Sequence, residues 1–365
     1  MKSMSVLLIL ISISLQAQAL KLAYYGETTI KHGAQFNKSV IGGLSGMMWA
    51  DGTLYAVSDD KGRLGDPRFF EFNLKIKDKK IELTPKAVHF ITGVPGKLEK
   101  TGGLDLEGLF RFVDGGLLLS SEGNSDSKPR VMPRILRVSS TGQWKSDLPL
   151  DDKYLPETTG QQKKGTQGNL AFESLTGLDG GKTVFTTTES ALLQDVKSGE
   201  EELGDRIRII KYEEKEKGLQ AVAEYAYQID AYSKNDKGQE FFRGVSEMLA
   251  VSDTKIIVLE RGVRIIGKGW ITPASLYLAD LSQATDVSKV TPLSQTKIKT
   301  AEKTKLIDLE MDLTKERPDK GMQNFEALSW GPTLPDGRRT VLVMSDNNFS
   351  KKETMELLVF TVEGE

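Results

Sequence analysis

Short apolar segments recur in pairs along this chain of 365 residues, and a turn joins the two segments of each pair. An acidic residue, or serine in the first pair, stands at the start of the first segment, and an acid follows the second. The five pairs occupy residues 45–59, 107–122, 173–189, 247–260 and 326–346. Their starts lie roughly 60 to 80 residues apart, which indicates a large repeat of the kind found in propellers, solenoids and arrays.

Each pair opens a unit of predicted strands. In the first unit, Asp51-Gly52 is a hairpin turn in which glycine supplies the positive φ. Phe69 to Ile76 alternates apolar and polar residues with the period of a strand, and Lys86 to Thr92 is the fourth predicted strand. Later strands are predicted at 107–113, 117–121, 134–139 and 144–150, then 173–178, 183–188, 206–212 and 220–229, then 247–251, 255–259, 275–281 and 305–309, and finally 326–330, 340–345 and 356–362.

The fifth unit is one strand short, and this determines the predicted architecture. Leu20 to Ile30 has the length and composition of a strand, but no partner hairpin lies next to it. We therefore predict an all-β fold, a β-propeller of five four-stranded blades that the N-terminal strand closes by pairing with the last unit. A sixth blade stays open if Ala284 to Leu313 contains a further sheet. An α-rich fold is excluded because the repeats lack the spacing of an amphipathic helix.

The first nineteen residues are typical of a secretory signal peptide. Lys2 supplies the positive charge, Val6 to Leu15 is apolar, and Ala17-Gln18-Ala19 offers small residues for cleavage. We expect residues 1–19 to be removed. Residues 20–365 are then predicted to form a single domain without a transmembrane segment, in the periplasm or outside the cell.

Composition narrows the possible partners. The formal net charge is −2, so the chain has no basic field to attract nucleic acid or an anionic membrane surface. It also has no cysteine, which excludes a disulfide framework and a lipid-anchoring cysteine at the cleavage site. A small anionic ester or a component of the cell envelope remains as the expected partner.

The repeated acids are the main candidates for a functional site. In a propeller blade, the loop that enters the first strand and the loop that leaves the second lie on one face, so these acids should ring one mouth of the central channel. The entry acids are Glu107, Glu173, Glu247 and Glu326, and the exit acids are Asp59, Glu122, Glu189, Glu260 and Asp346. Crowded carboxylates need cations, protons or main-chain N–H groups as compensation, and Ca²⁺ favours such oxygen-rich sites. The alternative is that each acid only caps the loop of its own blade.

Basic residues in the loops after the second strands should lie on the same face. Cations around an acidic centre suit a phosphate or another anionic ester held between a metal ion and guanidinium groups. The alternative is that these residues only neutralise the acids as ion pairs. We expect catalysis to involve Glu122, Glu173, Glu189 and Arg261. We expect substrate to contact Arg130, Arg134 and Asn347, and the metal ion to lie among Asp59, Glu107, Glu247, Glu260, Glu326 and Asp346.

These motifs resemble the esterase-like phytase family. The resemblance covers nearly all of residues 20–365. It is carried by Gly43-Leu44-Ser45-Gly46, Asp105-Leu106-Glu107-Gly108-Leu109, Asn169-Leu170-Ala171-Phe172-Glu173-Ser174-Leu175, Val258-Leu259-Glu260-Arg261, Asn324-Phe325-Glu326-Ala327-Leu328 and Ser345-Asp346-Asn347-Asn348-Phe349. It implies a secreted β-propeller that hydrolyses esters or phosphoesters. The dense acidic run of Asp-Ala-Asp-Asp-Pro type found in calcium-dependent propeller phytases is not present in this chain.

Two functions therefore remain in competition. One is a metal-assisted hydrolase of phosphate or other anionic esters, and the other is a non-catalytic envelope propeller that binds a glycan, a peptide or a protein partner. Serine or cysteine nucleophile chemistry is disfavoured because the chain has neither cysteine nor a Gly-x-Ser-x-Gly elbow. A cofactor-dependent oxidoreductase is disfavoured because no dinucleotide fingerprint is visible.

Overall fold

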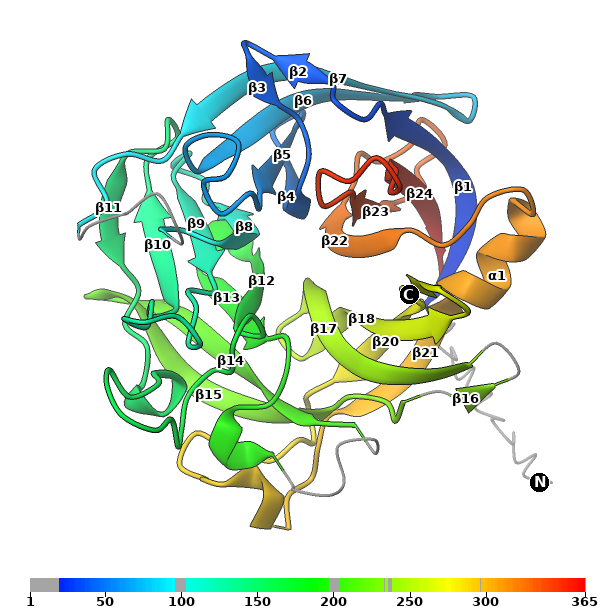
Figure 1. Ribbon diagram of the computed structural model, residues 1–365. Helices are drawn as coiled ribbons and strands as arrows, with labels where there is room; N and C mark the ends of the chain where they lie inside the picture. The colour runs from blue at the N-terminus through cyan, green and yellow to red at the C-terminus, as the bar shows by residue number, and fades with distance from the viewer. Residues whose placement is uncertain are drawn as a thin grey trace, which may run out of the picture.

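The computed structural model describes residues 20–95, 103–196, 204–232, 234–235, 238–295 and 297–364. The predicted signal peptide lies outside these residues. Five antiparallel sheets are arranged around a centre, and the first strand of each unit lies innermost (Figure 1). The predicted five-bladed propeller is confirmed, and within the described part of the 284–313 segment there is one strand and one helix rather than a further blade.

The blades follow one another along the chain. Blade 1 contains β4 (Leu44–Ala50), β5 (Thr53–Ser58), β6 (Arg68–Lys77) and β7 (Lys80–Phe90), and blade 2 contains β8 (Leu106–Arg111), β9 (Leu117–Ser121), β10 (Arg134–Val138) and β11 (Trp144–Asp147). Blade 3 contains β12 (Phe172–Leu178), β13 (Thr183–Thr188), β14 (Arg206–Lys215) and β15 (Gly218–Gln228). Blade 4 contains β17 (Gly238–Ser252), β18 (Lys255–Ile266), β20 (Ala274–Asp280) and β21 (Glu302–Asp308), with β16 (Lys234–Asn235) and β19 (Gly269–Ile271) attached.

Blade 5 joins the two ends of the described chain, as predicted. It consists of β22 (Asn324–Trp330), β23 (Thr340–Asp346), β24 (Met355–Glu363) and β1 (Lys21–Ile30). β1 pairs antiparallel with β24 from Lys21 opposite Glu363 to Ile30 opposite Met355. The ring is therefore closed by main-chain hydrogen bonds between segments more than 300 residues apart in sequence.

Elements outside the blades are short. β2 (Gln35–Phe36) and β3 (Ser39–Val40) form a small hairpin before blade 1, and α1 (Leu309–Glu316) connects blade 4 to blade 5. Single 3₁₀ turns occur at Asp152–Tyr154, Asp179–Gly181, Leu193–Asp195 and Leu293–Gln295. The described residues include no helix with the length and apolar character needed to cross a membrane.

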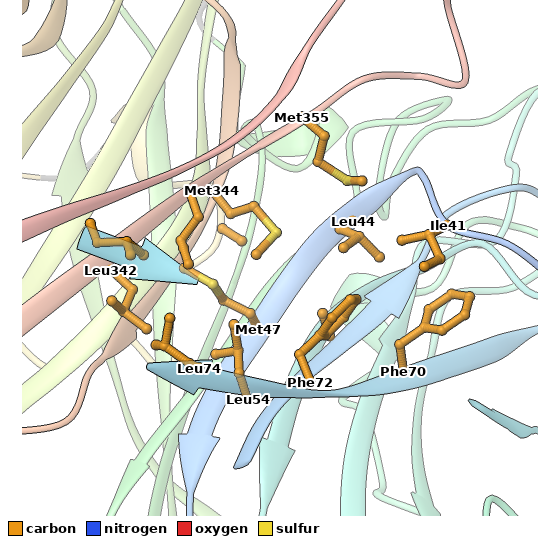
Figure 2. Packing of buried hydrophobic residues seen from close by; sticks show 14 of the residues in the cluster. Ile41, Leu44, Met47, Leu54, Phe70, Phe72, Leu74, Leu342, Met344 and Met355 are labelled. Carbon is orange, nitrogen blue, oxygen red and sulfur yellow. The ribbon is translucent and has the colours of Figure 1, made fainter. Parts of the chain in front are cut away.

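Apolar side chains between neighbouring sheets hold the blades together. Figure 2 shows the cluster between blades 5 and 1, where Leu342 and Met344 of β23 pack near Met47 of β4 and Leu54 of β5. Further clusters of buried residues fill other spaces between the sheets. Burial of apolar area is worth about 25 cal/mol per Å², so this packing fixes the inner strands and the residues at their ends.

Candidate functional site

A β-bulge near the start of the first strand leaves one residue of each blade outside the regular pairing, and in blades 2, 3 and 5 this residue is a glutamate that lines the mouth of the ring. In blade 3, Phe172 pairs with Thr188 and Ser174 with Thr187, so Glu173 is the extra residue. The same register shift occurs between the inner two strands of every other blade. The residues at this bulge are Ser45, Glu107, Glu173, Ser246 and Glu326. Bulges redirect side chains in this way beside many active sites.

A second set of side chains lies at the end of the second strand of each blade. Each one belongs to the residue that comes after the partner of the last inner-strand residue paired before the bulge. In blade 1, Leu44 pairs with Ser58, and the next residue is Asp59. The equivalent residues are Asp59, Glu122, Glu189, Arg261 and Asp346. The backbone N–H of Asp59 donates to the Gly43 carbonyl at 2.7 Å, and that of Glu189 donates to the Ala171 carbonyl at 2.7 Å. These bonds fix the exit residues against the inner strand of their own blade.

Blade 4 differs from the prediction by one residue. The bulge falls on Ser246 rather than Glu247, and Val245 pairs with Glu260, so the exit position belongs to Arg261. Glu260 instead accepts hydrogen bonds from Tyr227 Oη at 2.7 Å and Lys303 Nζ at 2.6 Å. Glu247 is buried and accepts from the Met248 N–H at 2.9 Å. The expected metal positions Glu247 and Glu260 are thus out of phase with the other blades, because pairing register rather than acidic sequence sets which side chain faces the mouth.

Seven residues of the two sets line a cavity of about 820 Å³, whereas Ser45, Glu122 and Ser246 do not line it. Its acidic lining consists of Asp59, Asp60, Glu107, Glu173, Glu189, Glu326 and Asp346, and its basic lining consists of Lys61, Arg63 and Arg261. Gly108 explains how neighbouring blades bring their acids so close. A Cβ there would lie 2.6 Å from the carbonyl oxygen of Glu173, so only glycine lets β8 approach β12 this closely.

Several of these carboxylates lie close enough to hold a metal ion. One ligand oxygen from each of Asp59, Asp105 and Glu107 lies within 4.8 Å of the others, and the same holds for Glu107, Glu122 and Glu173. Asp105 and Glu122 are 4% and 1% exposed, and each has one buried oxygen without a hydrogen-bond partner. Such orphaned oxygens are costly without a ligand, and the all-oxygen donor set fits a hard cation such as Ca²⁺.

Two cations are held beside these acids. Lys61 Nζ lies 2.8 Å from Asp105 Oδ2 and also donates to Asn169 Oδ1. Arg261 Nη2 lies 2.6 Å from Glu189 Oε1 and 3.6 Å from Glu326 Oε1. Burial opposes the charge on both, but the surrounding carboxylates outweigh it and raise the pKa of Lys61 and the pKa of Arg261. Both groups therefore stay charged inside the cavity.

Burial and mutual repulsion raise the pKa of most carboxyls in the cluster. Burial and the charges of Asp105 and Glu189 raise the pKa of Glu122 to about 8. Burial also raises the pKa of Glu189 to about 7, although Arg261 opposes the rise. The pKa values of Asp59, Glu107, Glu173 and Asp346 are raised well above their ordinary range, chiefly by burial and then by neighbouring groups. Part of the cluster therefore keeps protons at neutral pH when no cation is bound.

The raised pKa values predict how the stability of the metal-free protein depends on pH. A carboxyl whose pKa is higher in the folded state than in the unfolded state binds more protons when the protein is folded. Its contribution to the free energy of unfolding is therefore fully present below about pH 4.5 and is lost as pH rises through the folded-state pKa. Chemical denaturation in EDTA should show stability falling between pH 5 and 8, with a slope of about 1.4 kcal/mol per pH unit for each such group. Stability that is flat or rising over this range would contradict the raised pKa values.

Other predicted residues lie away from the acidic cluster or have structural partners. Arg134 forms a two-pronged ion pair with Asp147 of β11, with bonds of 2.7 and 3.0 Å. Arg130 donates to three backbone carbonyls, those of Ser125, Glu157 and Gly160. Neither arginine lines the cavity.

Asn347 and Asp105 both stand next to the cavity without lining it. Asn347 is 1% exposed, and its Oδ1 accepts from the N–H groups of Gly43 and Phe349 at 3.2 Å, which ties blade 5 to blade 1. Asp105 was not among the sequence-predicted site residues. The signal that points to it is its place just before Leu106-Glu107 in the second repeat.

Comparison with known proteins assigns the chain to a family. The model of the phytase-like family, described as "Esterase-like activity of phytase", matches residues 39–349, which include all five blades' inner strands. The chain belongs to the phytase-like family. A search of curated protein sequences found no match for this phytase-like protein.

Solved structures with a similar course of the chain are distant. An endo-arabinase from Bacteroides thetaiotaomicron is 12% identical, with a TM-score of 0.43 over 91% of this chain and 96% of that one. A xylan β-1,4-xylosidase from Bacillus halodurans is 11% identical, with a TM-score of 0.44 over 88% of this chain and 53% of that one. A bifunctional GH43-CE protein from Bacteroides eggerthii is 12% identical, with a TM-score of 0.42 over 90% and 34%. The chain thus spans about half and about a third of the last two, and likenesses at this level carry no argument about activity.

Proposed function

We propose that this phytase-like protein hydrolyses phosphate esters or other anionic esters with the help of a bound Ca²⁺ ion. The observation that carries the proposal is the cavity and the carboxylates that line or adjoin it. Asp59, Asp105 and Glu122 each have a buried oxygen without a partner, and the partly buried cations Lys61 and Arg261 lie beside them. Membership of a family described by esterase-like activity supports a hydrolase. A capping role alone does not account for orphaned oxygens on Asp105 and Glu122.

The residues suited to hold Ca²⁺ are those of the two overlapping groups. They are Asp59, Asp105, Glu107, Glu122 and Glu173. When bound, Ca²⁺ would withdraw charge from an ester oxygen and ease the deprotonation of a water molecule. The same ion would offset the repulsion among these carboxylates, so binding and stability should be coupled.

The remaining residues of the cavity supply binding and proton transfer. Arg261 and Lys61 can bind the anionic oxygens of the ester. Glu189 has a pKa of about 7, which suits a group that accepts a proton from the attacking water and returns it to the departing alcohol. The bond from the ester oxygen to phosphorus or carbon breaks, water supplies the new oxygen, and the products are the acid and the alcohol.

Export fits this activity. We propose that residues 1–19 direct the chain out of the cytoplasm and that residues 20–365 act as one periplasmic or secreted domain. Extracellular Ca²⁺ sites commonly bind in the range of 10⁻⁴ to 10⁻³ M, so the ion is available in such a compartment. The substrate would be a small anionic ester or an ester in a component of the cell envelope.

Turnover with and without metal tests the proposal. The mature protein, stripped with EDTA and then supplied with Ca²⁺, should hydrolyse a phosphomonoester or a carboxylic ester that carries an anionic group. Glu173→Gln should reduce this turnover about 100-fold or more, because the substitution removes a charge from the cluster without changing its shape. If both ester classes remain intact in Ca²⁺, the hydrolase proposal fails and a binding propeller becomes the better account.

A further inference from the structure

One wall of the cavity is apolar, and it begins at Arg261. Along β18, Arg261, Val263 and Ile265 all line the cavity. Alternate residues of a strand point to opposite faces, and the intervening Arg264 pairs with Glu310 of α1 instead. Four residues of strand span about 13 Å, so this face leads from the charged floor to the rim.

Neighbouring segments extend the same wall. Trp270 of β19 pairs with Ile265 across the sheet, and Phe241 is the extra residue of a bulge on β17. Leu64, from the loop between β5 and β6 of blade 1, lines the same cavity. We call Phe241, Val263, Ile265 and Trp270 of blade 4 the apolar wall; all four line the cavity.

The exposure of these side chains is unusual. Leu64, Phe241, Ile265 and Trp270 are 52%, 55%, 57% and 53% exposed. Single exposed apolar residues are common on protein surfaces, but apolar residues gathered at one site mark a binding surface. Four of the nine large apolar side chains that are exposed within the described residues line this one cavity, which makes chance scatter a poor explanation.

The wall is also held in place before any ligand binds. β17 and β18 stay paired beyond the bulge of the blade, from Val245 opposite Glu260 to Glu240 opposite Arg264, and β19 pairs with the end of β18. Behind the wall, Arg243 Nη2 lies 2.7 Å from Glu240 Oε1, and both residues are buried. A rigid apolar surface loses little conformational entropy when a ligand covers it.

We propose that the apolar wall binds the alcohol portion of the substrate, so that the cavity selects esters with an anionic group at one end and an alkyl or aromatic group at the other. This inference rests on the proposed ester site, since the anionic group is the one held by Arg261 and Lys61. A substrate charged on all sides would leave the wall facing charge rather than apolar atoms. When an alkyl or aromatic group of the substrate covers the wall, apolar surface of both is removed from water, which favours binding.

Two stable phosphonates that differ only in their alkyl group test the inference without any need for turnover. Hexylphosphonate and methylphosphonate should be titrated into the Ca²⁺-loaded mature protein by calorimetry. We expect hexylphosphonate to bind about tenfold tighter or more, since each methylene that the wall buries adds to affinity. Equal affinities, or no binding of either compound, would overturn the inference.

Substitutions in the apolar wall test whether it causes the tighter binding of hexylphosphonate. Trp270→Ala and Ile265→Ser should each weaken hexylphosphonate about tenfold and leave methylphosphonate unchanged, because neither side chain reaches the charged floor. Val113→Ser is the matched control, since Val113 is 83% exposed and lies outside this cavity. Equal weakening of both phosphonates by the wall variants would show a general disturbance and contradict the proposal.

The outcomes for the two proposals can be separated. Chain-length-dependent binding without hydrolysis of any ester would reject the proposed hydrolase and leave the apolar subsite standing. Hydrolysis of anionic esters at rates independent of the alcohol portion, with equal binding of the two phosphonates, would reject the subsite and leave the hydrolase standing.

Discussion

Glu107→Gln is expected to abolish the rise in melting temperature that the proposed Ca²⁺ site predicts for the parent protein. Glu107 is the one residue shared by both carboxylate groups that could hold the ion. Without a bound ion, burial and the charges of Glu173 and Asp59 raise its pKa well above the usual range, so glutamine should replace a largely protonated side chain at small cost. The variant should therefore fold but lose a negative ligand for the ion.

The size of the effect follows from mass action. At a Ca²⁺ concentration of about 100 times the dissociation constant, binding stabilises the folded state by about 2.7 kcal/mol. In a protein of this size that corresponds to a shift of several degrees, which thermal unfolding monitored by circular dichroism resolves. The shift should be present in the parent protein and absent from Glu107→Gln.

Glu247→Gln is the matched control. Glu247 is another buried glutamate of an inner strand, and burial raises its pKa well above the ordinary value, but it stands one residue after the bulge of blade 4. This variant should keep the full Ca²⁺ response. If Glu247→Gln loses the response while Glu107→Gln keeps it, the register that places Ser246 at the mouth does not describe the metal site.

The fold could be predicted because its determinants are local and repeated. Two or three residues specify each hairpin turn. At Asp51-Gly52, for example, both residues have the positive φ of the expected turn. The closure also followed from a count, because the fifth unit lacked the strand that Lys21–Ile30 supplies. Packing between the blades only requires apolar residues at alternate positions, so the repeat was sufficient.

The site was less predictable because it depends on register. In blades 1, 2, 3 and 5 an acid in the sequence coincides with an exit position. In blade 4 the same bulge falls on Ser246, one residue before Glu247, and the exit position belongs to Arg261, one residue after Glu260. A one-residue slip moves a side chain to the other face of a strand, and nothing in the sequence near Glu247 and Glu260 marks that slip. Asp105 was missed for a related reason, since it enters the cluster from the residue before β8 rather than from the repeated position.

The apolar wall was not predictable from the repeat at all. The sequence predicts no strand between 259 and 275, but β18 continues to Ile266 and β19 folds back on it. Because the extension belongs to blade 4 alone, comparison among the repeats could not reveal it. Blade 4, whose acids do not fall at the bulge and exit positions, thus provides both the ion-paired arginine of the mouth and the apolar wall.

Arg261→Met is expected to reduce the turnover of an anionic ester about 100- to 1,000-fold, the usual cost of removing a charged donor that stabilises a reacting anion. Arg261 is the guanidinium group that forms ion pairs with the acids of the mouth, since it lies beside both Glu189 and Glu326. Loss of the arginine should be tolerated by the fold, because Glu189 has a pKa of about 7 and can take up a proton when its partner is removed. Steady-state rates should be compared at equal concentrations of folded protein.

A neutral carboxylic ester of similar size and the variant Arg134→Met separate this role from general damage. The neutral ester should lose much less turnover in Arg261→Met, because the guanidinium acts through the negative charge of the substrate. Arg134→Met should keep full activity on both esters, since Arg134 is occupied by Asp147 on the outer strand of blade 2. If Arg261→Met slows both esters equally, or if Arg134→Met is the variant that loses the anionic substrate, then Arg261 serves only as the ion-pair partner of the acids and the anion is bound elsewhere.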